Sequence, residues 1–226
     1  MSTIQEYILN QVSEHKLPID QAKKMLVEME DKNDDIAIIG MACKFSKTKD
    51  IEGYWKNLTN MEECRTEFPR ERLEFIRNIS TNENFTQFLG THPVTEEELQ
   101  DTRKRGYLSE VGKFDADFFG ISPNEAKAID PDQRLMLEVV QDALIDAGCT
   151  RKALSNSKTG VYIGKDGTND TIYRYITEEE PSSMTGNWAS LIAGRINYLM
   201  NLKGSSMLLD SACSSGLVGV HLACKS

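Results

Sequence analysis

The chain has 226 residues, of which 39% are hydrophobic and 27% charged, as expected of a globular protein with one large domain or one domain and an appendage. The formal net charge of −9 argues against nucleic acid as the main partner, and no apolar run is long enough to span a membrane. Five cysteines without CxxC spacing, and an N-terminus without the features of a signal peptide, indicate reduced thiols and a cytoplasmic protein rather than a disulfide framework or a zinc site.

Residues 1–33 are expected to form a helical hairpin that is separate from the rest. The apolar residues of TIQEYILNQV recur at helical spacing, as do those of LPIDQAKKMLVEME, and Pro18 interrupts the chain between the two. Each helix is too short to be stable alone, so its apolar face needs a partner. Two interpretations remain open: an extension packed on its own domain, or a linker or docking segment between modules of a larger assembly.

Residues 34–226 predict an α/β domain. DIAIIG (35–40) and TGVYIG (159–164) are short apolar runs that end in glycine, as buried strands do, and SSMLLD near the C-terminus is a third. Residues 130–148 predict the clearest helix, with Asp130 as its cap, Pro131 at its first position, a buried stripe from Leu135 to Ala147 and Gly148 at its end. Helices that alternate with short strands indicate a layered α/β fold.

Cys213 lies in SSMLLDSACSSGLVGVHLA, where a strand ends and a helix begins. This edge of an α/β sheet is where such proteins place their functional sites. The partial positive charge and unpaired N–H groups of a helix N-terminus favour a thiolate and can stabilise an oxyanion during acyl transfer. The small residues around Cys213 permit a sharp turn and close substrate approach. The alternative is that Cys213 is a small buried residue without a chemical role.

Several motifs, in order along the chain, resemble the ketosynthase domains of modular polyketide synthases. DSACSSGLVGVHLA is similar to their active-site segment, and DIAIIGMACKF is similar to their opening strand. The long block from VGKFDADFFGISP to ALIDAG, and TGNWASLIAGRINYLMNLKG, resemble the stretches that lead to the nucleophile. The hairpin is similar, though less specifically, to the linkers or docking regions before such domains. Ser205, Ser211 and Gly216 depart from the commoner residues of the family.

The resemblance implies a thiolase-like fold with αβαβα layers, of which this chain supplies the N-terminal half, preceded by the helical hairpin. It implies that Cys213 is the catalytic nucleophile and accepts an acyl chain, which is extended by decarboxylative Claisen condensation with a malonyl-type unit. No metal and no directly bound cofactor are implied, because the substrates are carried on the phosphopantetheine of acyl carrier protein. The implied partners are that carrier protein, the C-terminal ketosynthase half, a second copy in a homodimer, and other synthase modules through the N-terminal helices.

Condensation in this family also uses two histidines and a lysine from later motifs, which this sequence does not contain. Of its three histidines, His15 belongs to the hairpin and His92 to a predicted surface excursion at residues 77–94. His221 follows Cys213 by eight residues, about 12 Å along a helix, which is too far to reach the sulfur. We therefore expect that the chain alone does not complete the reaction. The alternative function is a non-catalytic, truncated ketosynthase fragment that serves only association within a megasynthase.

Overall fold

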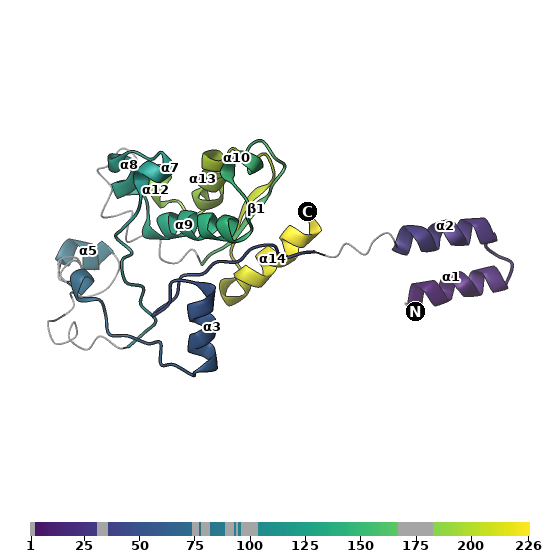
Figure 1. The fold of residues 1–226 in the computed structure, drawn as a ribbon, viewed down its shortest axis with the longest axis horizontal. Helices are drawn as coiled ribbons and strands as arrows, with labels where there is room; N and C mark the ends of the chain where they lie inside the picture. The colour runs from purple at the N-terminus through teal and green to yellow at the C-terminus, as the bar shows by residue number, and fades with distance from the viewer. Residues whose placement is uncertain are drawn as a thin grey trace. The chain divides into compact units, whose positions relative to one another are not determined.

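The computed structural model describes residues 3–30, 36–73, 77, 82–88, 93, 95, 104–166 and 183–226 (Figure 1). The chain forms two compact units, Met1–Ile38 and Ile39–Ser226. The boundary predicted from the sequence, at residue 33, falls in the stretch 31–35, which lies outside the described residues. No helix in these described ranges is both long and apolar enough to cross a membrane.

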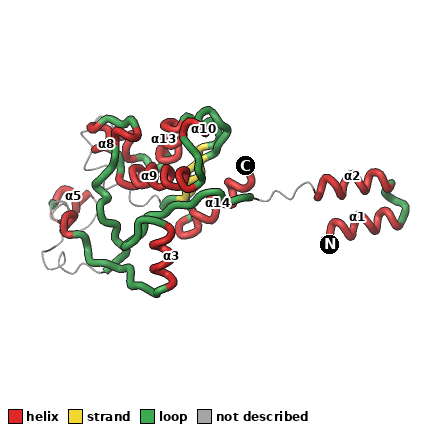
Figure 2. The backbone as a smooth tube through the Cα atoms, in the orientation of Figure 1, coloured by secondary structure: helices red, strands yellow, loops and turns green. Residues whose placement is uncertain are grey.

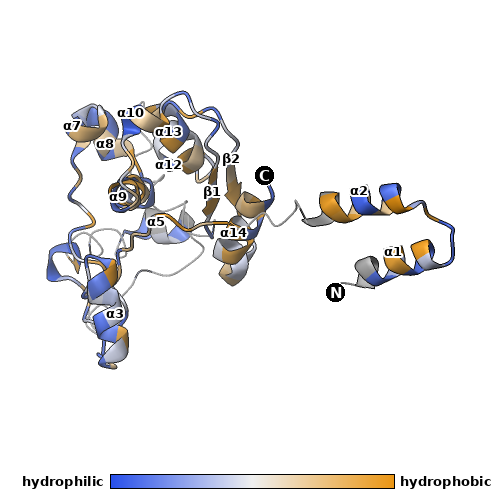
Figure 3. Cartoon of the chain, turned by 45° about the vertical axis from the view of Figure 1, so that its right-hand side comes forward, coloured by the Kyte–Doolittle hydropathy of each residue, from blue (hydrophilic) through white to orange (hydrophobic). Residues whose placement is uncertain are grey.

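The first unit is a hairpin of two helices, α1 (Thr3–Ser13) and α2 (Ile19–Glu30). Ile8 and Ala22 are buried where the helices meet, with 3% and 4% of their surface exposed. The turn between them begins where the N–H groups of Lys16 and Leu17 both donate to the Gln11 carbonyl. Apolar and polar stretches alternate along both helices (Figure 3), which agrees with the predicted hairpin.

The second unit contains the remaining elements. They are α3 (Ile51–Thr59), α5 (Glu83–Phe88), α7 (Ala116–Phe119), α8 (Pro123–Ala128), α9 (Pro131–Asp146), α10 (Arg151–Leu154), β1 (Val161–Gly164), α12 (Ser183–Asn187), α13 (Leu191–Met200), β2 (Ser206–Leu209), the 3-10 turn η2 (Ala212–Ser214) and α14 (Ser215–Lys225). The two strands pair in parallel, from Val161 opposite Ser206 to Gly164 opposite Leu209.

Helices cover both faces of this small sheet. Side chains alternate between the faces of a strand. Ile163 is buried in the core with Ile192 and Ile196 of α13, whereas the neighbouring Gly164 lies against the start of α14. Helix, sheet and helix therefore form three layers, as the α/β pattern predicts.

Helix α9 forms the long central element that the sequence predicts. The Asp130 side chain accepts the Asp132 N–H at 2.7 Å and Pro131 occupies the first turn, while Gly148 follows the helix in a left-handed conformation, with φ +66°. The predicted stripe is only partly correct. The most buried residues are Gln133 and Leu137, whereas the predicted stripe residues are only partly buried.

The prediction of a buried strand at residues 35–40 is wrong for its described part. Residues 36–44 are loop (Figure 2), and Ile38 and Ile39 remain 79% and 69% exposed. A strand exists only where its N–H and C=O groups pair with a neighbouring strand. Nothing among the described residues pairs with this segment in that way. Instead, the loop is attached to α9, where the Met41 N–H donates to the Asp146 carboxylate at 2.8 Å.

Candidate functional site

The turn that carries Cys213 connects β2 to α14. The strand ends at Leu209, the 3-10 turn η2 follows after Asp210 and Ser211, and α14 begins at Ser215. Cys213 occupies the middle of η2 and is exposed to solvent. The structure thus places this thiol between a strand end and a helix start, as the sequence predicts.

Ala212, directly before the cysteine, has a left-handed backbone conformation with φ +51°. This region costs a residue with a Cβ about 1–2 kcal/mol, so it persists only where surrounding contacts hold it. One such contact is the Asp210 carboxylate, which accepts the Ala212 N–H at 3.0 Å. The conformation changes the direction of the chain directly before the exposed Cys213.

Ser215 holds the same turn from the helix side. Its hydroxyl donates to the Ala212 carbonyl at 2.7 Å and accepts the Ser211 N–H at 2.8 Å. Only 4% of Ser215 is exposed, so these protein groups replace water as its partners. A further bond runs from the Ser214 hydroxyl to the Ser211 carbonyl at 2.8 Å. The turn is therefore a hydrogen-bonded unit rather than a loose loop.

The carboxyl end of β1 supports this turn. The Lys165 N–H donates to the Leu209 carbonyl at 3.0 Å and extends the parallel ladder to the point where the turn begins. The Lys165 side chain is only 11% exposed and forms an ion pair with Asp132 of α9 at 3.3 Å. Lys165 thus connects the end of β1 to α9.

Buried polar side chains join α9 to the segment before α13. Gln133 is 2% exposed, and its amide donates to the Gly186 carbonyl at 2.7 Å. Arg195 of α13 donates to Gln133 at 3.0 Å and to Glu125 of α8 at 2.6 Å. This network fixes α8, α9, α12 and α13 on the side of the sheet opposite α14.

The three histidines belong to different parts of the chain. His221 is exposed on α14, two turns beyond the cysteine, and His15 belongs to the turn of the separate hairpin unit. His92 falls outside the described residues. Within the described residues of the second unit, no histidine is therefore in a position to act as a general base on Cys213. Within the described ranges, no group of three or more potential ligands could hold a metal ion.

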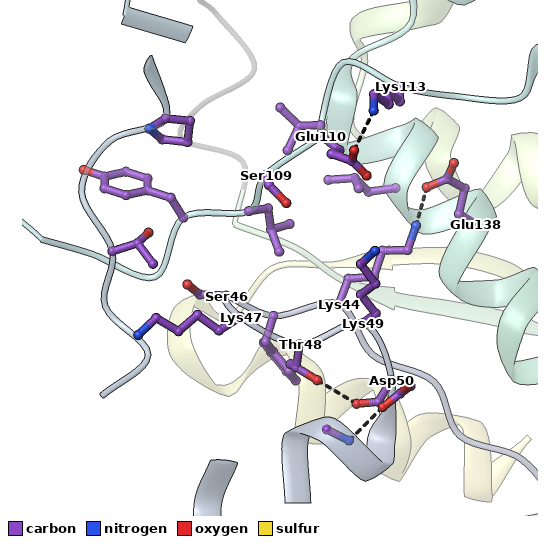
Figure 4. A pocket seen from close by; sticks show the side chains of 18 of the residues that line it. Lys44, Ser46, Lys47, Thr48, Lys49, Asp50, Ser109, Glu110, Lys113 and Glu138 are labelled. Carbon is purple, nitrogen blue, oxygen red and sulfur yellow. Dashed lines mark hydrogen bonds and ion pairs between the residues drawn. The ribbon is translucent and has the colours of Figure 1, made fainter. Parts of the chain in front are cut away.

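A cavity of about 980 Å³ lies elsewhere in the second unit, between the loop before α3, residues 107–113 and α9 (Figure 4). Two ion pairs lie within its wall, Lys44 with Glu138, and Lys113 with Glu110 at 2.5 Å. None of the residues that line it belongs to the Cys213 turn. The cavity is thus distinct from the candidate site.

Sequence reasoning missed two residues of the site. In the sequence Ser215 is one of several small residues around the cysteine, although its hydroxyl holds the turn, and Gly164 is the glycine that ends a predicted strand. The serine offered a weak signal, because a hydroxyl two residues after the nucleophile can reach back to the backbone. The glycine offered none, because its contact with α14 depends on packing.

Comparison with known proteins identifies relatives over most of the chain. Residues 33–226 match the family described as beta-ketoacyl synthase, N-terminal domain. The chain is 37% identical to the polyketide synthase GfsE of Streptomyces halstedii over 215 residues, 91% of this chain and 5% of that protein. It is 33% identical to the polyketide synthase PksN of Bacillus subtilis over 225 residues, 99% of this chain and 4% of that protein. The chain therefore spans a small part of the length of these relatives.

Solved structures show the same fold. The ketosynthase from module 6 of the bacillaene synthase from Bacillus subtilis matches with a TM-score of 0.61 and 31% identity, over 84% of this chain and 28% of that one. An oxazolomycin ketosynthase domain of Streptomyces albus matches with a TM-score of 0.63 and 30% identity, over 83% of this chain and 31% of that one.

Proposed function

The chain belongs to the β-ketoacyl synthase family and has the thiolase-like fold of ketosynthases, and on this basis we propose that it is part of a polyketide synthase ketosynthase in which Cys213 accepts the growing acyl chain. The chain corresponds to the N-terminal domain of that family. The reaction has two steps, acyl transfer to the cysteine and carbon–carbon bond formation.

In the first step the Cys213 thiolate attacks the carbonyl carbon of an acyl thioester on the phosphopantetheine of acyl carrier protein. The tetrahedral oxyanion collapses, the carbon–sulfur bond to the carrier breaks, and the carrier leaves as a thiolate that takes up a proton. The location of Cys213 supports this step, because the thiol is exposed and lies immediately before the N-terminus of α14.

In the second step a malonyl-type unit on the carrier loses carbon dioxide, and the resulting carbanion attacks the acyl group on Cys213. A carbon–carbon bond forms, the thioester to the cysteine breaks, and the Cys213 thiolate is regenerated. The described residues of the second unit offer the nucleophile but no histidine beside it. We propose that the groups that assist decarboxylation come from the C-terminal half of the ketosynthase fold.

Exposed apolar side chains support a contact with such a second half or with a second copy. On α14, Leu217 and Val220 are 79% and 61% exposed, and Met207 of β2 is 44% exposed. Soluble proteins rarely leave neighbouring apolar side chains in water unless another surface covers them. We propose that this face is covered in the assembled, cytoplasmic synthase, whose ketosynthases act as homodimers.

The single observation that carries the proposal is the exposed Cys213 in its hydrogen-bonded turn. The test is incubation with an acyl-phosphopantetheine thioester, followed by measurement of the intact mass. We expect one acyl group on the wild-type chain and none on Cys213→Ala. Cys224→Ala is the matched control, because Cys224 is also exposed and lies near the end of α14, and it should be acylated like the wild type. Acylation that survives in Cys213→Ala would remove this residue from the mechanism.

A second candidate function is association through the hairpin. The hairpin buries Ile8 and Ala22 but leaves Tyr7, Ile19 and Val27 more than half exposed. Helices of this length are marginal in water without packing, which supports a partner for this apolar surface, such as another synthase module. Tyr7→Ser/Val27→Ser should weaken binding to a neighbouring module in a pull-down without changing the acylation of Cys213. Unchanged binding would contradict a docking role.

A further inference from the structure

The peptide group between Ala212 and Cys213 is held through its carbonyl oxygen. The Ala212 carbonyl accepts two hydrogen bonds from Ser215, one from its backbone N–H and one from its hydroxyl at 2.7 Å. The same hydroxyl accepts the Ser211 N–H at 2.8 Å, so it acts as donor and acceptor at once. Ser215 thus ties Ser211 and the strained Ala212 to the first turn of α14.

This arrangement fixes the direction of the Cys213 N–H. A trans peptide is planar, so its C=O and N–H point in opposite directions. With the carbonyl directed at the buried Ser215, the N–H on the far side of the same plane is directed away from it. No acceptor among the described residues takes the Cys213 N–H. It remains available beside an exposed thiol.

We propose that Ser215 is a positioning residue that holds the 212–213 peptide so that the Cys213 N–H can donate to the oxyanion formed during acyl transfer. The inference rests on the proposed function, because it assumes that Cys213 is acylated. An oxyanion donor acts only if it is oriented before the reaction, since reorientation during the reaction would cost part of the stabilisation.

Rotation of the 212–213 peptide would exchange the positions of its two polar groups. The carbonyl oxygen would then face the developing negative charge, and the N–H would face Ser215. The 3-10 bond from the Ser215 N–H opposes this rotation, and the hydroxyl adds a second bond in a site that is closed to water. Loss of the hydroxyl leaves the carbonyl with one bond from Ser215 and the Ser211 N–H without its partner in the turn.

The test separates acyl transfer from simple reactivity of the thiol. Alkylation of Cys213 by iodoacetamide forms no oxyanion, whereas acylation by a thioester does. Ser215→Ala should lower the acylation rate constant about tenfold, the equivalent of one hydrogen bond, and leave the alkylation rate constant within about twofold. Ser122→Ala is the control, because it also removes a hydroxyl that accepts a backbone N–H, at the start of α8 and outside the turn. It should change neither rate.

A fall of both rates by the same factor, or of neither, would overturn the proposal. The amide resonance of Ser211 and the carbonyl carbon resonance of Ala212 provide a second measurement that does not require acylation. Both should shift in Ser215→Ala and stay in place in Ser122→Ala, and unchanged resonances would show that the hydroxyl does not hold the peptide. Failure of the wild type to acylate, with these shifts observed, would refute the proposed function and leave the role of Ser215 in the turn intact.

Discussion

Gly164, the last residue of β1, lies directly against Ser215, the first residue of α14. A Cβ at residue 164 would stand 2.6 Å from the carbonyl carbon of Ser215 and 2.7 Å from its oxygen, closer than real Cβ atoms approach. Helix α14 and its hydrogen-bonded turn can therefore occupy this position only because residue 164 has no side chain.

Gly164→Ala should displace the start of α14 from the sheet. We expect a loss of about 1–3 kcal/mol in the free energy of unfolding. The new Cβ would meet backbone atoms of Ser215, which cannot move aside without shifting the helix. A displaced turn should also alter the alkylation rate of Cys213. The control is Gly194→Ala in α13, where a Cβ meets nothing within 4 Å. That change should leave stability equal or slightly higher. Equal stability of the two variants would contradict the close contact at Gly164.

Gln133→Leu should destabilise the second unit although the two side chains are similar in size. It removes the bonds to the Gly186 and Trp188 carbonyls and leaves the Arg195 Nε without its partner. Unsatisfied polar groups in a buried site should cost about 1–3 kcal/mol, measured by chemical denaturation. Gln87→Leu on the exposed side of α5 serves as the control and should stay within about 0.5 kcal/mol. A neutral effect at Gln133 would show that packing rather than hydrogen bonding holds α9 and α13 together.

Arg65 lowers the pKa of the Glu63 carboxyl from 4.5 to about 2, first through its side-chain hydrogen bonds and then through its backbone N–H. A lowered pKa means that the interaction is fully present above pH 4.5 and is lost as the pH falls through 2. Arg65→Gln keeps the backbone donor, so the pKa of Glu63 should rise part of the way towards its ordinary value in a carbon-detected NMR titration.

The pKa of Glu110 provides the internal control for that titration. Lys113 lowers it, so Arg65→Gln should leave it unchanged. Because Glu63 and Arg65 are both exposed, we expect no detectable change in thermal stability. A Glu63 carboxyl that titrates identically in both proteins would contradict the pairing.

The thiols should differ in their reactivity towards iodoacetamide at neutral pH. Cys213 and Cys224 are exposed, whereas Cys43 is partly buried, and burial, followed by the charge of Asp50, raises the pKa of its thiol. Peptide mass spectrometry should therefore detect label on Cys213 and Cys224 before Cys43. Asp50→Asn, which keeps a side-chain oxygen for the Gly53 N–H, should speed the labelling of Cys43 modestly and leave the other two unchanged. Labelling of Cys43 first would contradict the structure.

The sequence predicts correctly those elements that are determined by residues close together in the chain. Asp130, Pro131 and Gly148 mark the limits of α9 because caps and left-handed ends depend on residues within one turn. The placement of Cys213 between strand and helix followed from an apolar run, a cluster of small residues and renewed helical periodicity. The prediction of a strand at 35–40 is wrong because it rests on composition alone. A strand also needs a neighbouring strand to pair with, and that neighbour comes from a distant part of the chain.

Motifs and spacings of neighbouring residues are enough to identify the family, the limits of α9 and the residue proposed as nucleophile. How the site is held depends on contacts between segments that are distant in the sequence. The contact between Gly164 and Ser215 joins residues far apart in the chain, and the bond from the Ser215 hydroxyl to Ala212 depends on a left-handed backbone that no propensity favours for alanine. Packing brings such groups together and makes a strained conformation persist, and neither effect is encoded in any short stretch of residues.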